Sequence, residues 1–312
     1  MFGNFRLSMT WLHTWFGLVL GYVLMAAFFN VVAVFVFHLS VAATVGKGIV
    51  DQGIIDHYVV FGALIGAIAW NIITWYYGIP SSSSHALIGG IVGASVAKAG
   101  TWALIPAGIL KVVAFIFLSP LIGFIVGSLL LLAISWIFRR ATPSRVDRLF
   151  RRLQLFSSSL YSLGHGGNDA QKTIGIIWML LIATGYCGAQ DPVPVWVVIA
   201  CYATIGAGTM FGGWRIVKTM GQRITKIRPV GGFCAELSGS IALFTATGFG
   251  IPVSTTHTIA GAIVGVGSTQ NVSAVRWGIA GNLVWAWILT IPCSAFIAGA
   301  AWYLGRLLLS SS

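Results

Sequence analysis

The chain has 312 residues, of which 57% are hydrophobic and only 8% are charged, and its mean hydropathy is +0.92. A soluble domain could not keep this much apolar surface away from water, so the composition excludes soluble proteins and predicts an integral membrane protein. The excess of 18 Lys and Arg over 6 Asp and Glu would suit nucleic acid. Most basic residues, however, lie in two loops between apolar segments, where positive charge sets membrane orientation instead.

Eight apolar stretches meet or approach the roughly 20 residues that one membrane crossing requires. In chain order they are 15–37, 58–77, 102–118, 120–137, 173–186, 194–213, 231–249 and 278–303. Two shorter apolar pieces, 85–96 and 257–267, are interpreted as half-helices or re-entrant arms. The segment Met1–Phe16 carries one charge, Arg6, and no small-residue cleavage site, so we expect an uncleaved first span.

A block of glycine, proline and hydroxyl residues occurs twice. Segments 78–93 and 250–265 are identical at nine of sixteen positions, with a constant offset of 250 − 78 = 172. Each block starts with Gly-Ile-Pro and continues into a hydroxyl triplet and a histidine: Ser82, Ser83, Ser84 and His85, then Ser254, Thr255, Thr256 and His257. Proline frees a backbone carbonyl, which lipid cannot satisfy. We therefore expect both blocks inside the protein near the bilayer midplane, as in transporters built from repeats.

A basic linker at 138–153 separates the first predicted repeat, 1–137, from the second, 154–312. The linker carries Arg139, Arg140, Arg145, Arg148, Arg151 and Arg152, and a later loop carries Arg215, Lys218, Arg223, Lys226 and Arg228. The positive-inside rule places both on the cytoplasmic side. Residues 146–153 alternate apolar and basic positions at helical spacing, which fits either an amphipathic helix on anionic headgroups or a solvated loop.

Two acidic residues, Asp169 and Glu236, lie within apolar passages, where charge is costly and usually functional. Asp169 belongs to the polar, glycine-rich run Gly164–Thr173. Glycines there allow close approach to a ligand, Asn168 and Asp169 offer oxygens to a cation, and Lys172 offers positive charge to an anion. The alternative is that Asp169 and Lys172 only neutralise each other one turn apart.

The two hydroxyl triplets directly precede apolar, helix-like runs. Hydroxyls and free N–H groups at a helix N-terminus bind phosphate or a similar oxyanion, so the triplets form a candidate anion cradle, together with Thr173. The alternative is that they are ordinary N-caps and small packing residues. His85 and His257 either titrate or hydrogen-bond a carbonyl, and Glu236 is either a proton or cation site or a carboxylate satisfied by neighbouring hydroxyls.

The sequence contains no pattern for a metal, a cofactor or an enzyme nucleophile. The cysteines Cys187, Cys201, Cys234 and Cys293 have no ligand-like spacing, and His13, His38 and His57 are isolated. Walker, Rossmann, zinc and GxSxG patterns do not occur. We therefore predict no cofactor, no metal and no catalytic residues. An intramembrane enzyme that uses His165 and Asp169 as acid and base is the weakest alternative.

The run Gly166–Asp169, the two hydroxyl-histidine blocks and the run Gly232–Glu236 together closely resemble the PiT family of inorganic phosphate transporters, over roughly residues 26–305. The resemblance implies a multi-pass carrier with inverted repeats that moves phosphate with sodium or protons by alternating access. It also implies that a bacterial member can carry phosphate as a neutral metal complex.

Two departures from the family pattern affect this reading. In the signature Gly-Ala-Asn-Asp-x-x-Asn the last position falls on Lys172, and a protonated lysine cannot ligate sodium, which favours proton coupling. Family members also carry a matching Asn/Asp signature in the first repeat. Counting back 172 from Asp169 gives −3, and residues 1–26 contain no Asp or Glu. The first-repeat signature is therefore expected to be missing.

The sequence thus predicts an all-α polytopic membrane transporter built from two repeats with broken or re-entrant helices. We expect it to import inorganic phosphate by proton symport through the cytoplasmic membrane. The partners are phosphate, a proton in preference to sodium, and the lipid bilayer, without nucleic acid; a homodimer is left open. Coupling-ion candidates are Asp169, Glu236, His85 and His257. The alternatives are another oxyanion, such as sulfate or arsenate, and a truncated, non-transporting regulatory membrane protein.

Overall fold

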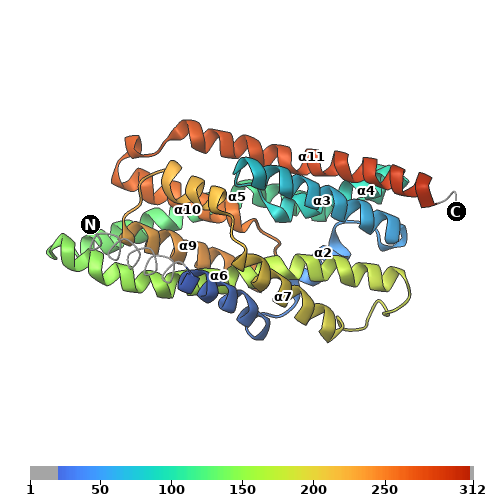
Figure 1. The fold of residues 1–312 in the computed structure, drawn as a ribbon, viewed down its shortest axis with the longest axis horizontal. Helices are drawn as coiled ribbons and strands as arrows, with labels where there is room; N and C mark the ends of the chain where they lie inside the picture. Colours follow the sequence, from blue (N-terminus) through green and yellow to red (C-terminus); the bar gives the residue numbers. More distant parts are fainter. Residues whose placement is uncertain (1–19, 310–312) are drawn as a thin grey trace, which may run out of the picture.

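The computed structural model describes residues 20–309, and within them the chain is helical (Figure 1). After a first helix at Leu20–Phe35 the elements are α2 (Ser40–Gly48), α3 (His57–Tyr77), α4 (Ser83–Ala99), α5 (Pro106–Ile137), α6 (Pro143–Ala183), α7 (Val195–Met210), α8 (Trp214–Lys218), η4 (Thr219–Arg223), α9 (Pro229–Gly248), α10 (Thr255–Gln270) and α11 (Trp277–Leu309). Short 3-10 turns connect some of them, including η1 (Ala33–Phe35). The predicted all-α class is confirmed, while Met1–Phe16 and the start of the first predicted span lie outside the described residues.

The offset of 172 also relates whole helices. α9 starts 229 − 57 = 172 residues after α3, α10 starts 255 − 83 = 172 after α4, and α11 starts 277 − 106 = 171 after α5. The bent pairs Leu20–Phe35 with α2 and α7 with α8 and η4 correspond at a slightly larger offset, 210 − 35 = 175 and 214 − 40 = 174, with bends of 78° and 65°. Within residues 20–309, α6 has no counterpart. On this correspondence we propose the two-repeat division at 138–153.

The two halves interleave in space. α4 packs along α11 of the other half, and α10 packs along α5. The helices approach closely because glycines without a Cβ atom lie at the contacts. An added Cβ at Gly93 would lie 2.1 Å from the Ala295 oxygen, and one at Gly265 would lie 2.3 Å from the Phe124 oxygen. Small residues at helix crossings are typical of membrane proteins, in which packing has to replace the hydrophobic effect.

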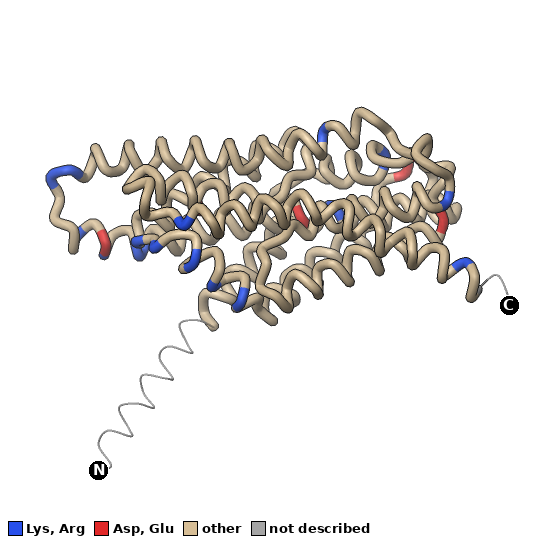
Figure 2. The backbone as a smooth tube through the Cα atoms, turned by 90° about the horizontal axis from the view of Figure 1, so that it is seen from above, with Lys and Arg blue, Asp and Glu red and all other residues tan. Residues whose placement is uncertain are grey.

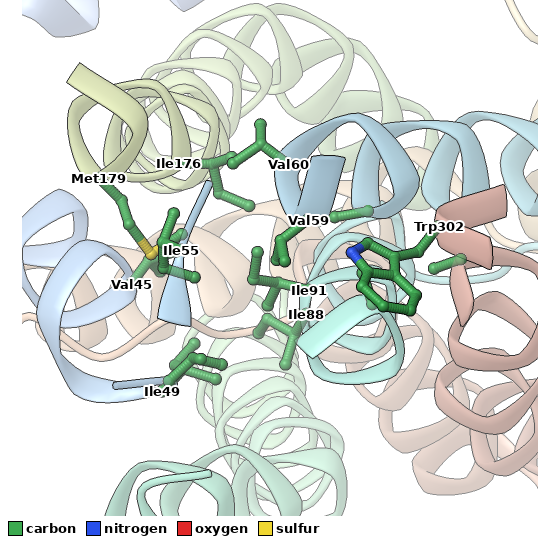
Figure 3. Packing of buried hydrophobic residues seen from close by; sticks show 14 of the residues in the cluster. Val45, Ile49, Ile55, Val59, Val60, Ile88, Ile91, Ile176, Met179 and Trp302 are labelled. Atoms are coloured by element: carbon green, nitrogen blue, oxygen red, sulfur yellow. The ribbon is translucent and has the colours of Figure 1, made fainter. Parts of the chain in front are cut away.

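A buried apolar cluster fixes the second half of α6 to the helices of the first half. Ile176 and Met179 of α6 lie against Val45 of α2, Val60 of α3 and their neighbours (Figure 3). Side chains in this cluster are nearly inaccessible, with Val45 at 2% and Ile176 at 1% exposure. The cluster therefore holds α6 in register with the helices that carry the first hydroxyl triplet.

Some predicted spans are wrong in their limits. Segments 102–118 and 120–137 are a single helix, α5, because Pro120 is accommodated inside it instead of ending it. α6 starts within the predicted linker and has 41 residues, or about 60 Å at about 1.5 Å per residue. In the described part, four helices are long and apolar enough to span a membrane, or up to six if each bent pair counts as one span.

Charge is distributed unevenly along the molecule. Figure 2 shows many Lys and Arg positions toward the end at which α5 passes into α6, with an acidic position among them, whereas the opposite end has fewer basic positions and several acidic ones. The first turns of α6 expose Arg145, Arg148 and Arg151 while burying Phe150 against Phe138 and Phe233. This part of the linker is therefore an amphipathic helix, and the cytoplasmic orientation of this end is a proposal.

Candidate functional site

Both Gly-Ile-Pro blocks fold into the same helix–loop–helix turn. Gly78 ends α3 with φ of +67° and Gly250 follows α9 with φ of +64°, a left-handed conformation that glycine adopts without strain. After a short extended stretch, Ser82 and Ser254 each cap the next helix, accepting a hydrogen bond at 3.2 Å from the N–H three residues later. The block thus turns the chain and starts α4 or α10 inside the protein.

The central part of α6 packs closely against the segment from Asn30 to Ala42, because its glycines leave room for neighbouring groups. An added Cβ would lie 2.3 Å from the Asn30 oxygen at Gly166, 2.3 Å from the Phe37 ring at Gly167, and 2.6 Å from the Ala42 oxygen at Gly175. The polar side chain of Asp169, on the same helix, reaches the N-terminal ends of α4 and α10.

Asp169 lies where the two hydroxyl triplets meet. Its Oδ1 accepts from Lys172 at 2.6 Å and from Ser84 at 3.3 Å. Its Oδ2 accepts from Thr255 at 3.1 Å and lies 3.1 Å from Nε2 of His165. One carboxylate therefore joins α6 to α4 and to α10. The two roles predicted for this pair are not exclusive, because Asp169 and Lys172 neutralise each other and also contact the triplets.

Lys172 is 2% exposed, and all three of its ammonium hydrogens have acceptors. They are Ser84 at 2.5 Å, Asp169 at 2.6 Å and the carbonyl of Val253 at 2.6 Å. A buried ammonium needs this complete set of partners, because an unpaired charge would be strongly destabilising. In this conformation Lys172 has no hydrogen left to offer an anion.

Asn168 holds the second turn in place. Its amide nitrogen donates to Thr247 at 2.9 Å and to the carbonyl of Ile251 at 3.2 Å, and its oxygen accepts from the N–H of Val253 at 3.3 Å. The side chain is fully buried. Asn168 therefore satisfies backbone groups that Pro252 leaves without a regular helical partner.

The six hydroxyls of the triplets fall into three pairs. Ser82 and Ser254 are helix caps, whereas Ser84 and Thr255 bind Asp169. Ser83 is exposed and Thr256 is half-buried. Neither contributes a side-chain hydrogen bond within the described residues.

A pocket of about 430 Å³ adjoins this network between α6 and α7. Its polar lining comes from Ser83, His165, Asp169, Thr173 and Thr204. A tetrahedral oxyanion is much smaller than this volume, so the pocket can admit one beside the carboxylate. A cavity of the same volume between α5, α10 and α11 is instead lined by apolar residues.

A model of the phosphate transporter family matches residues 20–298. The chain belongs to the phosphate transporter family. It is 59% identical over 278 residues to a protein of Rhizobium meliloti (strain 1021) described as a probable low-affinity inorganic phosphate transporter, covering 89% of this chain and 83% of that protein. A Bacillus subtilis (strain 168) protein with the same description is 44% identical over 284 residues, covering 90% and 85%. The predicted resemblance is confirmed.

A solved structure described as the sodium-dependent phosphate transporter shares the fold, with a TM-score of 0.82 over 91% of this chain and 89% of that chain at 22% identity. Family members are transporters, so this chain is a multi-pass membrane transporter and not an enzyme.

The other predicted coupling residues have partners of their own. Glu236 on α9 accepts from Ser157 at 2.5 Å, and Ser157 is 12 residues before Asp169, or about 18 Å along α6. His85 and His257 are buried with ring centres 4.7 Å apart, and His257 stacks on Trp287 at 4.1 Å. Within the described residues none of the three makes a hydrogen bond or ion pair with Asp169, and their coupling role stays a prediction.

Sequence reasoning missed three residues that complete the surroundings of Asp169. Asn30 faces Nδ1 of His165 at 2.9 Å and donates to Thr209 at 3.1 Å, while Thr247 supports Asn168. A polar Asn30 inside the apolar stretch 15–37 was the available signal, since such residues usually face the protein interior. Thr209 and Thr247 resemble ordinary helix threonines and gave no signal.

Proposed function

We propose that this chain imports inorganic phosphate across the cytoplasmic membrane as a proton symporter. The observation that carries the proposal is the junction at Asp169, where one carboxylate and Lys172 meet the N-terminal ends of two duplicated helices. Such ends bring together hydroxyls, free N–H groups and partial positive charge, which together bind a phosphate. The described function of the bacterial relatives supports the same substrate.

We assign substrate contacts to the pocket and to the network that closes it. The proposed contacts are Ser83 and Thr173, which line the pocket, together with Ser82, Ser84, Ser254, Thr255, Thr256, Asn168, Asp169 and Lys172. Since Lys172 and Asn168 have all their donors engaged, those two can reach phosphate only after the turns move away from α6. Rocking of α4 and α10 against α6 would expose the site alternately to the two sides.

The coupling ion is proposed to be a proton. Every close partner of the Asp169 oxygens is a group that donates or can donate hydrogen, and the Lys172 ammonium already supplies the neighbouring positive charge. A sodium ion would have to displace that ammonium. The related fold described as sodium-dependent makes sodium the necessary comparison in any test.

Two finer points remain part of the proposal. The first is whether phosphate crosses as the free anion or as a neutral metal complex. The second is selectivity: competition of sulfate and arsenate with labelled phosphate measures how far the hydroxyl cradle discriminates between oxyanions. The rival function is a non-transporting regulatory membrane protein.

The deciding experiment is uptake of labelled phosphate into proteoliposomes that contain the purified chain. Uptake should rise with an inward proton gradient at constant sodium and should not respond to an inward sodium gradient at constant pH. Stimulation by sodium alone would overturn proton coupling. A folded, correctly inserted protein without uptake under either gradient would favour the regulatory alternative.

A further inference from the structure

We propose that His165 and Asp169 hold one proton between them, and that this proton crosses the membrane with phosphate. The inference rests on the proposed phosphate transport and identifies His165, on the pocket wall, as a further residue of the coupling step. Four side chains form a hydrogen-bonded series from Thr209 through Asn30 and His165 to Asp169, and the position of each hydrogen in the series can be assigned.

The first member of the series is Thr209, whose hydroxyl has a single hydrogen. It donates that hydrogen to the carbonyl of Ile205 at 2.8 Å, so its oxygen can only accept from Asn30. The Asn30 amide nitrogen donates to it at 3.1 Å, which turns the Asn30 oxygen toward His165. The orientation of Asn30 is thus determined by Thr209.

The Asn30 oxygen accepts hydrogen only, and it lies 2.9 Å from Nδ1 of His165. Nδ1 must therefore carry a hydrogen. In a neutral imidazole, Nε2 would then be bare. Nε2, however, faces Oδ2 of Asp169 at 3.1 Å, and two lone pairs at that distance repel each other. One additional proton has to lie between them, on Nε2 as imidazolium or on the carboxyl group.

The position of the pair allows that proton to leave and return. The His165 side chain is 32% exposed and lines the pocket in which phosphate is expected, whereas Asp169 is 10% exposed and faces inward. Removal of the proton breaks the His165 contact with Asp169 and leaves the carboxylate to Lys172 and the hydroxyls of α4 and α10. Proton release is thereby linked to the contacts that hold both turns against α6.

Other charged and titratable groups act on the same pair. Lys172 lies one turn away on α6 and favours an ionised Asp169. His85 of α4 and His257 of α10 directly follow the hydroxyl triplets in the sequence. His85 interacts electrostatically with Asp169 and Lys172, and its ring centre lies 4.7 Å from that of His257. The first helix and α7 contribute the uncharged Asn30 and Thr209, so within the described residues the one ionised partner that contacts His165 is Asp169.

The test compares His165→Gln with His57→Gln, an exposed histidine at the start of α3 that has no part in the network. Glutamine donates to Asp169 but cannot release a proton. In proteoliposomes, H165Q should exchange labelled phosphate for unlabelled phosphate while its stimulation by an inward proton gradient falls from several-fold to none. H57Q should behave like the unmodified protein.

A second variant, Asn30→Asp, gives His165 a charged acceptor and should hold the proton more tightly. Its uptake should fall off at a higher pH than that of the unmodified protein. Gradient stimulation that persists in H165Q would overturn the proposal. If H165Q does not exchange phosphate, an unshifted pH profile in N30D overturns it instead. Failure of the unmodified protein to exchange phosphate refutes the proposed function itself, which is a separate outcome.

Discussion

The two Gly-Ile-Pro blocks have the same backbone but different contacts. Both use a left-handed glycine and a serine cap, yet Asp169 binds the third hydroxyl of the first triplet, Ser84, and the second hydroxyl of the second, Thr255. Their equivalents at the offset of 172, Thr256 and Ser83, do not contact it. The difference arises because a single residue of α6, Asp169, binds both blocks. The repeat therefore determines the backbone of the two turns, and α6 determines which of their hydroxyls bind the carboxylate.

The largest effect is expected from removing the carboxylate that joins the blocks. Asp169→Asn should abolish phosphate uptake while membrane insertion persists, since the apolar helices are unchanged. It leaves Lys172 without its ionic partner, and breaking a buried pair costs about 3–5 kcal/mol. Uptake and thermal unfolding in detergent measure the two effects. Normal uptake by D169N would remove the acid from the mechanism.

A smaller effect should distinguish equivalent hydroxyls. Ser84→Ala removes a partner of both Asp169 and Lys172, and hydrogen bonds to charged groups contribute about 1.5–3 kcal/mol. Thr256→Ser, at the equivalent position, should leave stability within about 0.5 kcal/mol because its hydroxyl is retained and makes no such contact. Equal destabilisation of the two variants would contradict the assignment of Asp169 to one hydroxyl of each block.

The helix caps should behave alike in both blocks. Ser82→Ala and Ser254→Ala each remove one capping bond of 3.2 Å, and loss of such a cap typically costs about 1 kcal/mol. Thermal unfolding should show similar losses for the two variants. A loss confined to one variant would mean that the duplicated backbone is not equally important in the two halves.

The sequence predicted the parts of this architecture that depend on local pattern. The offset of 172 identified the paired turns, and the isolated charges of Asp169 and Lys172 identified the junction. It could not predict that α4 packs on α11 and α10 on α5, because a repeat does not specify which copies pack together. Pro120 was misleading for a physical reason: a membrane helix tolerates proline when neighbouring helices satisfy the backbone groups that the proline frees.

Asn30 illustrates the remaining limit. Its role depends on His165 and Thr209, which are 135 and 179 residues away in the chain. No spacing rule connects residues that far apart, so only the fold reveals the contact. For Asn168 the motif correctly indicated an important residue but did not reveal its contacts. In the structure Asn168 donates to Thr247 and to the carbonyl of Ile251, and so supports the second turn.

The smallest predicted effect concerns the helix starts that precede the blocks. Asp56 caps α3 by accepting from the Val59 N–H at 2.8 Å and pairs with Lys98 at 2.6 Å, whereas its equivalent in the second half, 56 + 172, is Arg228, which makes no side-chain cap. Burial by itself raises the pKa of Asp56, but hydrogen bonds from Lys98 and Val59, with the nearby positive charges, lower it overall below its usual 3.8.

Because the folded-state pKa of Asp56 is lowered, the pair stabilises the fold above the pKa of the unfolded chain, and the stabilisation is lost as pH falls through the lower, folded-state pKa. Both side chains are about 30% exposed, so the contribution stays below about 1 kcal/mol. Asp56→Asn should therefore lower the unfolding temperature slightly at pH 7 and not in strongly acidic buffer, whereas Asp51→Asn, outside this ion pair, serves as control. An equal loss at both pH values would mean that the effect of the substitution does not depend on the charge of Asp56.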